Sequence, residues 1–135
     1  MKEQLLLTVD NARTYTLQVA EAMPEEAYTY KPNGAGWNFG ELLNHIAYGI
    51  GWWQDNYITG NKTGWHPPAA KTTRKEVIAE LIKNFEALHN ILKQQALTEQ
   101  AVYGVHATLD HITHHRGQAV LYLRTKGITP PEYMY

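Results

Sequence analysis

The sequence predicts an all-α protein, an antiparallel four-helix bundle that forms a single domain over residues 1–135. Four segments carry apolar residues every three to five positions, the spacing of one face of an amphipathic helix. Stretches rich in turn-forming residues separate them, and no segment alternates in polarity for long enough to predict a strand. The chain has 135 residues, of which 44% are apolar, and no flexible linker, so we expect one core.

The first two helices have clear boundary signals. The first predicted helix runs from Lys2 to Met23 and ends at Pro24. The second covers about Phe39 to Thr59. Asn38 is placed to cap it, and Glu41, three residues later, completes the pattern of an N-terminal capping box.

Two glycines, Gly49 and Gly51, lie inside the second predicted helix. Each costs about 1 kcal/mol relative to alanine in a helix interior. A close approach of another helix, or room for a ligand, would offset that cost.

The third and fourth helices follow a loop at residues 60–71. The third opens at Thr72 or Thr73, both suitable caps, and ends near Gln95. The fourth starts between residues 98 and 105 and runs to Lys126, where basic residues and a following glycine are typical of a helix C-terminus.

Composition excludes several classes of function. The chain has 12 basic and 13 acidic residues, so it lacks the basic excess of nucleic-acid-binding proteins. It contains no cysteine, which rules out disulfides, thiolate metal ligands and a cysteine nucleophile. The N-terminus is too polar for a signal peptide, and no apolar stretch approaches the ~20 residues that span a bilayer. We expect a cytoplasmic protein that binds neither nucleic acid nor a membrane.

Histidines on the fourth helix indicate half of a metal site. His111, His115, Gln118 and Tyr122 share one helical face. Imidazoles four residues apart are close enough to bind one ion at ~2.0 to 2.1 Å. His114 lies three residues after His111 and is an alternative to His115, although the spacing of four is the more natural chelate.

A third ligand has to come from another helix, and His45 is the histidine in the apolar run of the second helix. Three histidines leave at least one coordination position open, as in catalytic centres. Imidazole suits zinc, nickel, iron and cobalt, so spacing leaves the metal open. The alternative interpretation is that these are core histidines satisfied by hydrogen bonds, or histidines that face solvent.

Three further side chains are candidate substrate contacts. Gln118 is placed to hydrogen-bond a ligand or a water on the metal, and Tyr122 shares its face. Tyr48 belongs to an aromatic set on the second helix that suits a pocket wall or simple packing. Arg116 points about a quarter turn away, so we expect it to pair with a carboxylate or to pack at an interface.

Two segments resemble a known family. They read YKPNGAGWNFGELLNHIAYG, which contains His45, and LDHITHHRGQAVLYLRTKGITPPEY, in which a histidine and three further residues precede HRGQ. Both are similar to the DinB family, also called DinB/YfiT-like metalloenzymes. The resemblance assigns the metal ligands to His45, His111 and His115. It implies an up-down-down-up bundle with a long crossover, a homodimer, and one divalent ion, zinc or nickel.

The resemblance also implies a metal-dependent S-transferase that joins a low-molecular-weight thiol, such as bacillithiol or mycothiol, to a small electrophile. Two alternatives stay open: a non-catalytic, stress-related protein that binds metal or a small ligand, and a metal-dependent hydrolase, which lacks an obvious carboxylate base. The connection 96–110 is shorter than relatives usually have, which would alter the pocket. The tail Tyr133, Met134 and Tyr135 is either a partner contact or a frayed end.

Overall fold

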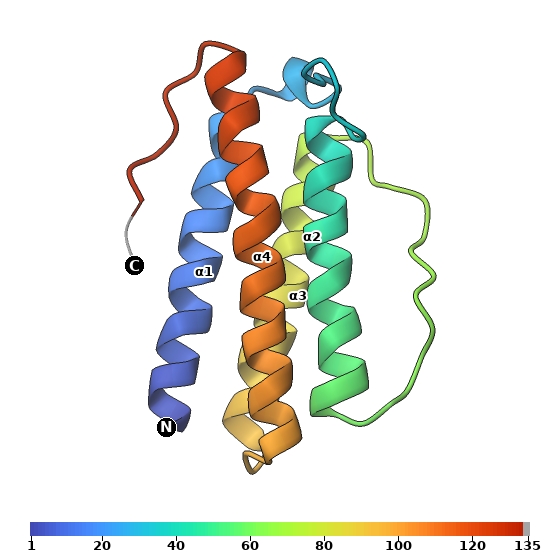
Figure 1. Cartoon of the computed structure of the whole chain (residues 1–135), viewed down its shortest axis with the longest axis vertical. Coiled ribbons are helices and arrows are strands. Elements are labelled where there is room, and N and C mark those ends of the chain that lie inside the picture. The colour runs from blue at the N-terminus through green and yellow to red at the C-terminus, as the bar shows by residue number, and fades with distance from the viewer. Residues whose placement is uncertain (134–135) are drawn as a thin grey trace.

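The computed structural model describes residues 1–133, and the last two residues of the aromatic tail, Met134 and Tyr135, lie outside it. The described part has four long helices and no strand, which confirms the predicted fold class (Figure 1). The helices are α1 (Lys2–Ala22), α2 (Phe39–Trp53), α3 (Arg74–Gln94) and α4 (Glu99–Thr125), with short helices η1 (Glu25–Ala27) and η2 (Gln54–Ile58).

The helices follow the up-down-down-up order that the resemblance implied. In Figure 1, α1 and α4 run upward, whereas α2 and α3 run downward. Helix α2 packs against both α3 and α4, and α1 packs against the same two helices from the other side. Two consecutive parallel helices need a connection as long as the bundle, and the crossover at residues 59–73 provides it. The antiparallel neighbours are α2 with α4 and α1 with α3.

The predicted start of α2 is confirmed, but its end differs. The Asn38 side chain accepts from the Glu41 amide at 2.8 Å, and the Glu41 carboxylate accepts from the Asn38 amide at 2.9 Å. The α-helical pattern stops at Trp53 and widens into the π-helix η2, where the Thr59 amide donates to the Gln54 carbonyl at 2.9 Å. The helical region ends at Ile58, with Thr59 as its C-cap, and its last turn is wider than periodicity can reveal.

The starts of α3 and α4 also carry side-chain caps, whereas the start of α1 does not. Thr73 accepts from the Glu76 amide at the start of α3, and Thr98 accepts from the Ala101 amide at the start of α4. Because α4 is helical from Glu99, residues 95–98 alone connect it to α3. The segment 96–110 therefore adds helix rather than loop to the molecule.

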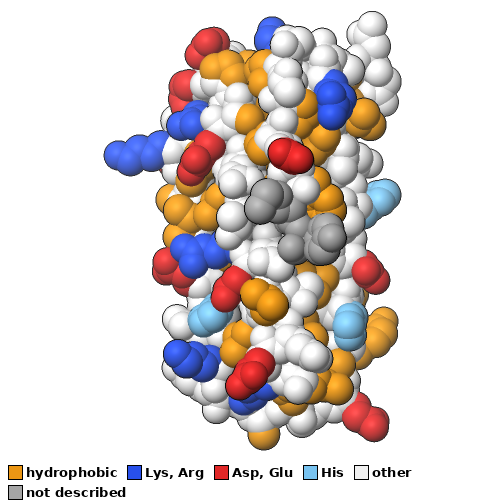
Figure 2. Space-filling model, turned by 90° about the vertical axis from the view of Figure 1, so that its left-hand side faces the viewer, with side chains coloured by type: hydrophobic (Ala, Val, Ile, Leu, Met, Phe, Trp, Pro, Cys, Tyr) orange, Lys and Arg blue, Asp and Glu red, His pale blue; other side chains and the backbone are white. Residues whose placement is uncertain are grey.

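A single apolar core fills the space between the four helices. Its largest fully buried side chains come from α2, α3, α4 and the turn after α1: Met23, Phe39, Leu42, Leu43, Ile46, Ile50, Leu81, Phe85, Leu88, Leu92, Ile112 and Leu123. Figure 2 shows basic and acidic side chains interspersed on the face that carries α1, in keeping with the near-balanced charge. Within residues 1–133, no helix is long and apolar enough to cross a bilayer.

Candidate metal centre

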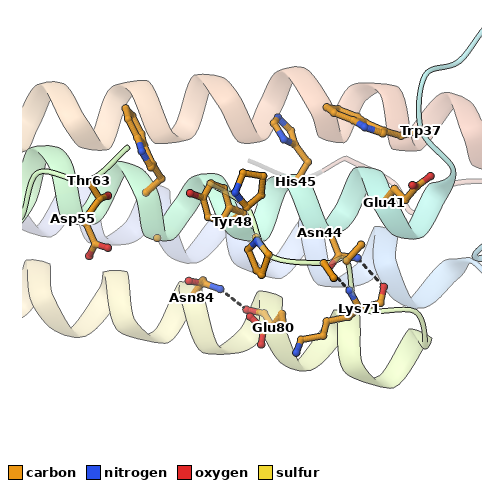
Figure 3. Close-up of a pocket in the computed structure, with 17 residues that line it drawn as sticks. Trp37, Glu41, Asn44, His45, Tyr48, Asp55, Thr63, Lys71, Glu80 and Asn84 are labelled. Carbon is orange, nitrogen blue, oxygen red and sulfur yellow. Dashed lines mark hydrogen bonds between the residues drawn. The ribbon is translucent and has the colours of Figure 1, made fainter. Parts of the chain in front are cut away.

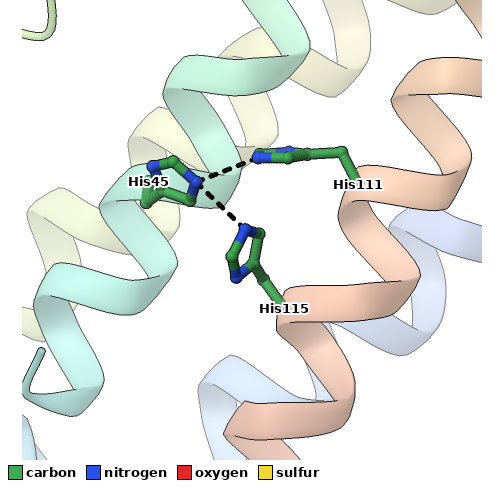
Figure 4. Close-up of side chains that lie close together, drawn as sticks. All are labelled: His45, His111 and His115. Atoms are coloured by element: carbon green, nitrogen blue, oxygen red, sulfur yellow. Dashed lines mark hydrogen bonds between the residues drawn. The ribbon is translucent and has the colours of Figure 1, made fainter. Parts of the chain in front are cut away.

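Three histidines from two helices meet at one point of the bundle (Figure 4). His45 projects from α2, and His111 and His115 project from successive turns of α4. The Nε2 atom of His45 lies 2.9 Å from Nε2 of His111 and 3.1 Å from Nε2 of His115. Within residues 1–133, this is the one group of histidine and carboxylate ligand atoms that all lie within 4.8 Å of one another. His114 is exposed and does not belong to it.

The spacing of these nitrogens fits a single ion. Two nitrogens on a tetrahedral zinc ion with Zn–N bonds of ~2.0 to 2.1 Å are about 3.3 Å apart. The observed separations of 2.9 and 3.1 Å are close to that value. A neutral imidazole has one donor and one acceptor nitrogen, so hydrogen bonds among the three rings cannot pair all three converging Nε2 atoms well.

The protonation of the histidines also favours a cation. Burial, and then the nearby His115, lower the pKa of His45 from 6.5 to about 4. Burial followed by the neighbouring histidines lowers the pKa of His111 to about 4 as well. Burial lowers the pKa of His115, against a hydrogen bond with Gln118 that raises it. At neutral pH the imidazoles are therefore uncharged and carry the lone pairs that metal binding needs.

Gly49 gives His111 the room that it occupies. A Cβ atom at position 49 would lie 2.5 Å from Cε1 of His111 and 2.7 Å from its Nδ1. The imidazole therefore lies directly on the backbone of α2. The helix-weakening cost of this glycine is offset by the approach of a side chain from α4, one of the two explanations that the sequence suggested.

Gln118 orients His115 from one turn further along α4. The Nδ1–H of His115 donates to Oε1 of Gln118 at 2.9 Å. This bond fixes the tautomer in which Nε2 carries the lone pair, the usual support of a metal-binding histidine. A direct contact of Gln118 with substrate stays a prediction.

Two tryptophans, both about two-fifths exposed, flank the three histidines. The ring centroid of Trp37 lies 4.5 Å from that of His45 and 5.9 Å from that of His115. Trp65, from the crossover, lies 5.5 Å from His45 and 6.3 Å from His111. The centre thus has aromatic walls. Sequence reasoning missed Trp65 because a loop residue has no periodicity to assign it a direction.

Tyr122 supports one of these walls. Its side chain is buried, and its hydroxyl donates to the backbone carbonyl of Trp37 at 2.7 Å. Burial is the main cause that raises the pKa of this hydroxyl. The structure therefore places Tyr122 beneath the tryptophan, and its predicted contact with substrate stays a prediction.

A cavity of about 340 Å³ adjoins the centre at His45 (Figure 3). It lies between α2, α3 and the crossover, and its polar lining includes Asn44, Asn84 and Glu80. Tyr48 lines it, and its hydroxyl accepts from the His66 amide at 2.8 Å, whereas its predicted contact with substrate stays a prediction. A cavity of this size accommodates a small organic molecule.

Arg116 lies on the opposite side of α4 from the centre. It forms no ion pair within residues 1–133, so the expected carboxylate partner is not found there. The side chain is buried against α1 and Tyr133 instead.

Comparisons with known proteins identify the family. The model of the DinB superfamily matches residues 8–123, most of the chain. The chain belongs to the DinB superfamily. No curated protein matches the sequence.

Solved structures of DinB-like proteins have the same fold. One from Bacillus cereus ATCC 10987 superposes with a TM-score of 0.82 at 19% identity, covering 98% of this chain and 97% of the other. Another, from Bacillus subtilis, has a TM-score of 0.76 at 23% identity, covering 97% of this chain and 98% of the other. Identities this low show the shared fold alone.

Proposed function

We propose that this DinB-superfamily protein holds one divalent metal ion, zinc or nickel, on His45, His111 and His115, and uses it to activate a low-molecular-weight thiol for transfer to a small electrophile. The observation that carries the proposal is the convergence of three uncharged imidazole nitrogens at 2.9 and 3.1 Å beside a cavity. The thiol, rather than another substrate, is inferred from the family resemblance.

The residues around the centre have distinct tasks in this proposal. When bound, the ion would act as a Lewis acid that lowers the pKa of a thiol in the open coordination position. Trp37 and Trp65 limit the access of water to that position, and low water content strengthens electrostatic interactions. The electrophile would occupy the cavity beside His45, with Tyr48 as one wall.

The absence of cysteine agrees with a thiol that comes from outside, because no side chain of the protein competes for the metal as a thiolate. The proposal also includes a cytoplasmic location, where low-molecular-weight thiols stay reduced, and a homodimer. The homodimer is supported by the family resemblance alone.

The first test measures metal content. Protein without an affinity tag is purified as wild type, His111→Ala and His114→Ala, and bound metals are measured by plasma mass spectrometry. We expect near-stoichiometric metal in wild type and in His114→Ala, because His114 lies outside the cluster, and a loss of metal in His111→Ala. Equal metal in all three proteins, or none in wild type even after reconstitution, would reject the site.

The second test measures chemistry. Metal-loaded wild type and His111→Ala are incubated with a low-molecular-weight thiol and a panel of alkyl halides and epoxides, and free thiol is titrated over time. We expect metal-dependent thiol consumption that the variant lacks. Stoichiometric metal without any turnover would instead favour the non-catalytic binding protein, and turnover of esters or amides without thiol would favour the hydrolase.

A further inference from the structure

A second polar site lies on the other side of α4, centred on Arg116. This side chain follows His115 directly, but it points toward α1, whereas the histidines point toward α2. It is only 5% exposed, although a guanidinium is among the most strongly polar groups in proteins. A buried arginine normally has a carboxylate partner, and within residues 1–133 this one has none within 4.0 Å.

The contacts of Arg116 leave part of its hydrogen-bonding capacity unused. Its guanidinium carbon lies 5.0 Å from the ring centroid of Tyr15 and 5.5 Å from that of Tyr133. Nη1 donates two long hydrogen bonds, at 3.5 Å, to the Ala12 carbonyl and to Oγ1 of Thr16, and a side-chain hydrogen bond with Tyr133 helps to hold the pKa of the guanidinium up. Burial lowers the pKa of Arg116, and the nearby Tyr133 and Tyr15 raise it by less. The two tyrosines therefore compensate only part of the hydration that the guanidinium has lost.

Arg116 also lines a cavity of about 270 Å³. It lies between α1 and α4, next to Tyr133, and its other polar lining residues are Thr8, Asn11 and Thr113. Two hydroxyls and an amide add neutral donors to the charged one. The part of the lining that belongs to residues 1–133 carries no carboxylate, so it offers a small ligand only donors and neutral groups.

We propose that this cavity binds a small oxyanion, a carboxylate or phosphate group, on the planar edge of the Arg116 guanidinium. Aromatic rings attract a guanidinium through its faces, whereas its N–H groups point outward in the plane. Nη1 is directed to α1 and Tyr133 takes part in one further hydrogen bond, so the in-plane donors that are left would serve the ligand. Two parallel charge-assisted hydrogen bonds to one oxyanion are the arrangement that arginine favours. This site is independent of the metal centre and of the reaction proposed there.

The test uses inorganic phosphate as the probe. The thermal midpoint of the full chain is followed as phosphate replaces chloride at constant ionic strength, because a ligand that binds only the folded state raises the midpoint in a saturable way. We expect saturation for wild type, and about a tenfold or greater loss of phosphate affinity for Arg116→Met. Acetate in place of phosphate then shows whether the site prefers a carboxylate.

Two controls separate this site from other effects. Arg124→Met removes one exposed charge from the same helix, and His111→Ala disables the metal centre; both should keep the phosphate affinity of wild type. If Arg116→Met does not fold, Arg116→Lys serves, together with the NMR signal of the Arg116 Nε–H group in wild type, which phosphate should shift. No saturable response in wild type, an unchanged affinity in the Arg116 variants, or an unshifted Nε–H signal would overturn the proposal.

Discussion

At the scale of single residues, Gly49 makes room for one of the ligands, because the imidazole of His111 lies where a Cβ atom would be. Gly49→Ala should displace that ring and lower metal affinity by about tenfold or more, as changes next to a metal ligand commonly do. The variant should also be less stable than wild type when both are free of metal. Overpacking against His111 should lower the free energy of unfolding by about 1 to 3 kcal/mol, which outweighs a gain of about 1 kcal/mol from helix propensity. Metal titration and urea unfolding measure the two effects.

The matched control for this substitution is Gly117→Ala. Gly117 is also inside a helix, but a Cβ atom there would meet nothing within 4 Å. This variant should keep wild-type metal affinity and gain roughly 0.5 to 1 kcal/mol of stability from helix propensity alone. If both alanine variants bind metal as tightly as wild type, the contact between position 49 and His111 does not matter for the site.

Gln118 should act on metal binding through His115 rather than by touching the ion. Gln118→Ala removes the acceptor and frees the His115 ring to rotate. We expect metal affinity to fall by about tenfold, which is the small end of the effect of residues that hydrogen-bond a metal ligand, because the Gln118 side chain is exposed. Gln118→Glu keeps an acceptor at the same position and should retain most of the affinity. A loss of equal size in both variants, measured by competitive metal titration, would show that the hydrogen bond to Nδ1 is not the cause.

At the scale of secondary-structure elements, α2 and η2 hold the crossover in place with side chains four residues apart. These side chains bond the loop at successive points, namely Asn44 with Lys71, Tyr48 with His66, Trp52 with Gly64, and Asn56 with Thr63. Residues at this spacing share one helical face, so a single stripe of α2 bonds the loop along its length. The two bonds at positions 64 and 66 flank Trp65 and fix its backbone beside the histidines.

Tyr48→Phe should loosen the crossover locally. The substitution removes the hydroxyl that accepts from the His66 amide while it keeps the ring that packs on Trp65. We expect faster hydrogen exchange at the His66 amide. The free energy of unfolding should fall by at most about 0.5 to 1.5 kcal/mol, because water replaces the lost acceptor at this exposed position. The Lys71 amide, held by Asn44, is the internal control and should exchange as in wild type. Equal acceleration at both amides would mean that the whole loop opens as one unit.

At the scale of the whole molecule, the partly buried histidines of the centre couple stability to pH. The pKa of His45 and of His111 is about 4 in the folded protein, against an ordinary value of 6.5. Between these values the unfolded chain binds more protons than the folded one, so the free energy of unfolding decreases as pH falls through this window. Each histidine contributes at most about 1.4 kcal/mol per pH unit, and less here because the groups are coupled and partly hydrated.

This pH dependence is measurable by urea unfolding of chelator-treated protein at about pH 7.5 and about pH 4.5. Wild type should be less stable at the lower pH, and the double variant His45→Gln with His111→Gln should show a smaller difference. His106→Gln, at an exposed position, should behave as wild type. If the double variant loses as much stability as wild type, other groups cause the acid sensitivity.

The sequence alone was sufficient for much of the fold, because helix boundaries are set by local interactions. Asn38 with Glu41, and Thr73 at the start of α3, cap helices at the expected positions. The spacing of four residues between His111 and His115 placed both imidazoles on one face of α4 without any knowledge of packing. The up-down-down-up order came from the family resemblance, since periodicity does not determine the order in which helices pack.

Only the tertiary structure decided what lies opposite each of these residues. The separation of α2 and α4 and the path of the crossover determine three contacts of the centre. His111 lies on Gly49, Gln118 orients His115, and Trp65 covers the centre. The burial of Arg116 without a carboxylate within residues 1–133 depends likewise on α1. Periodicity fixes the direction of a side chain relative to its own helix, whereas its neighbours depend on how separate helices pack, which distant parts of the chain determine together.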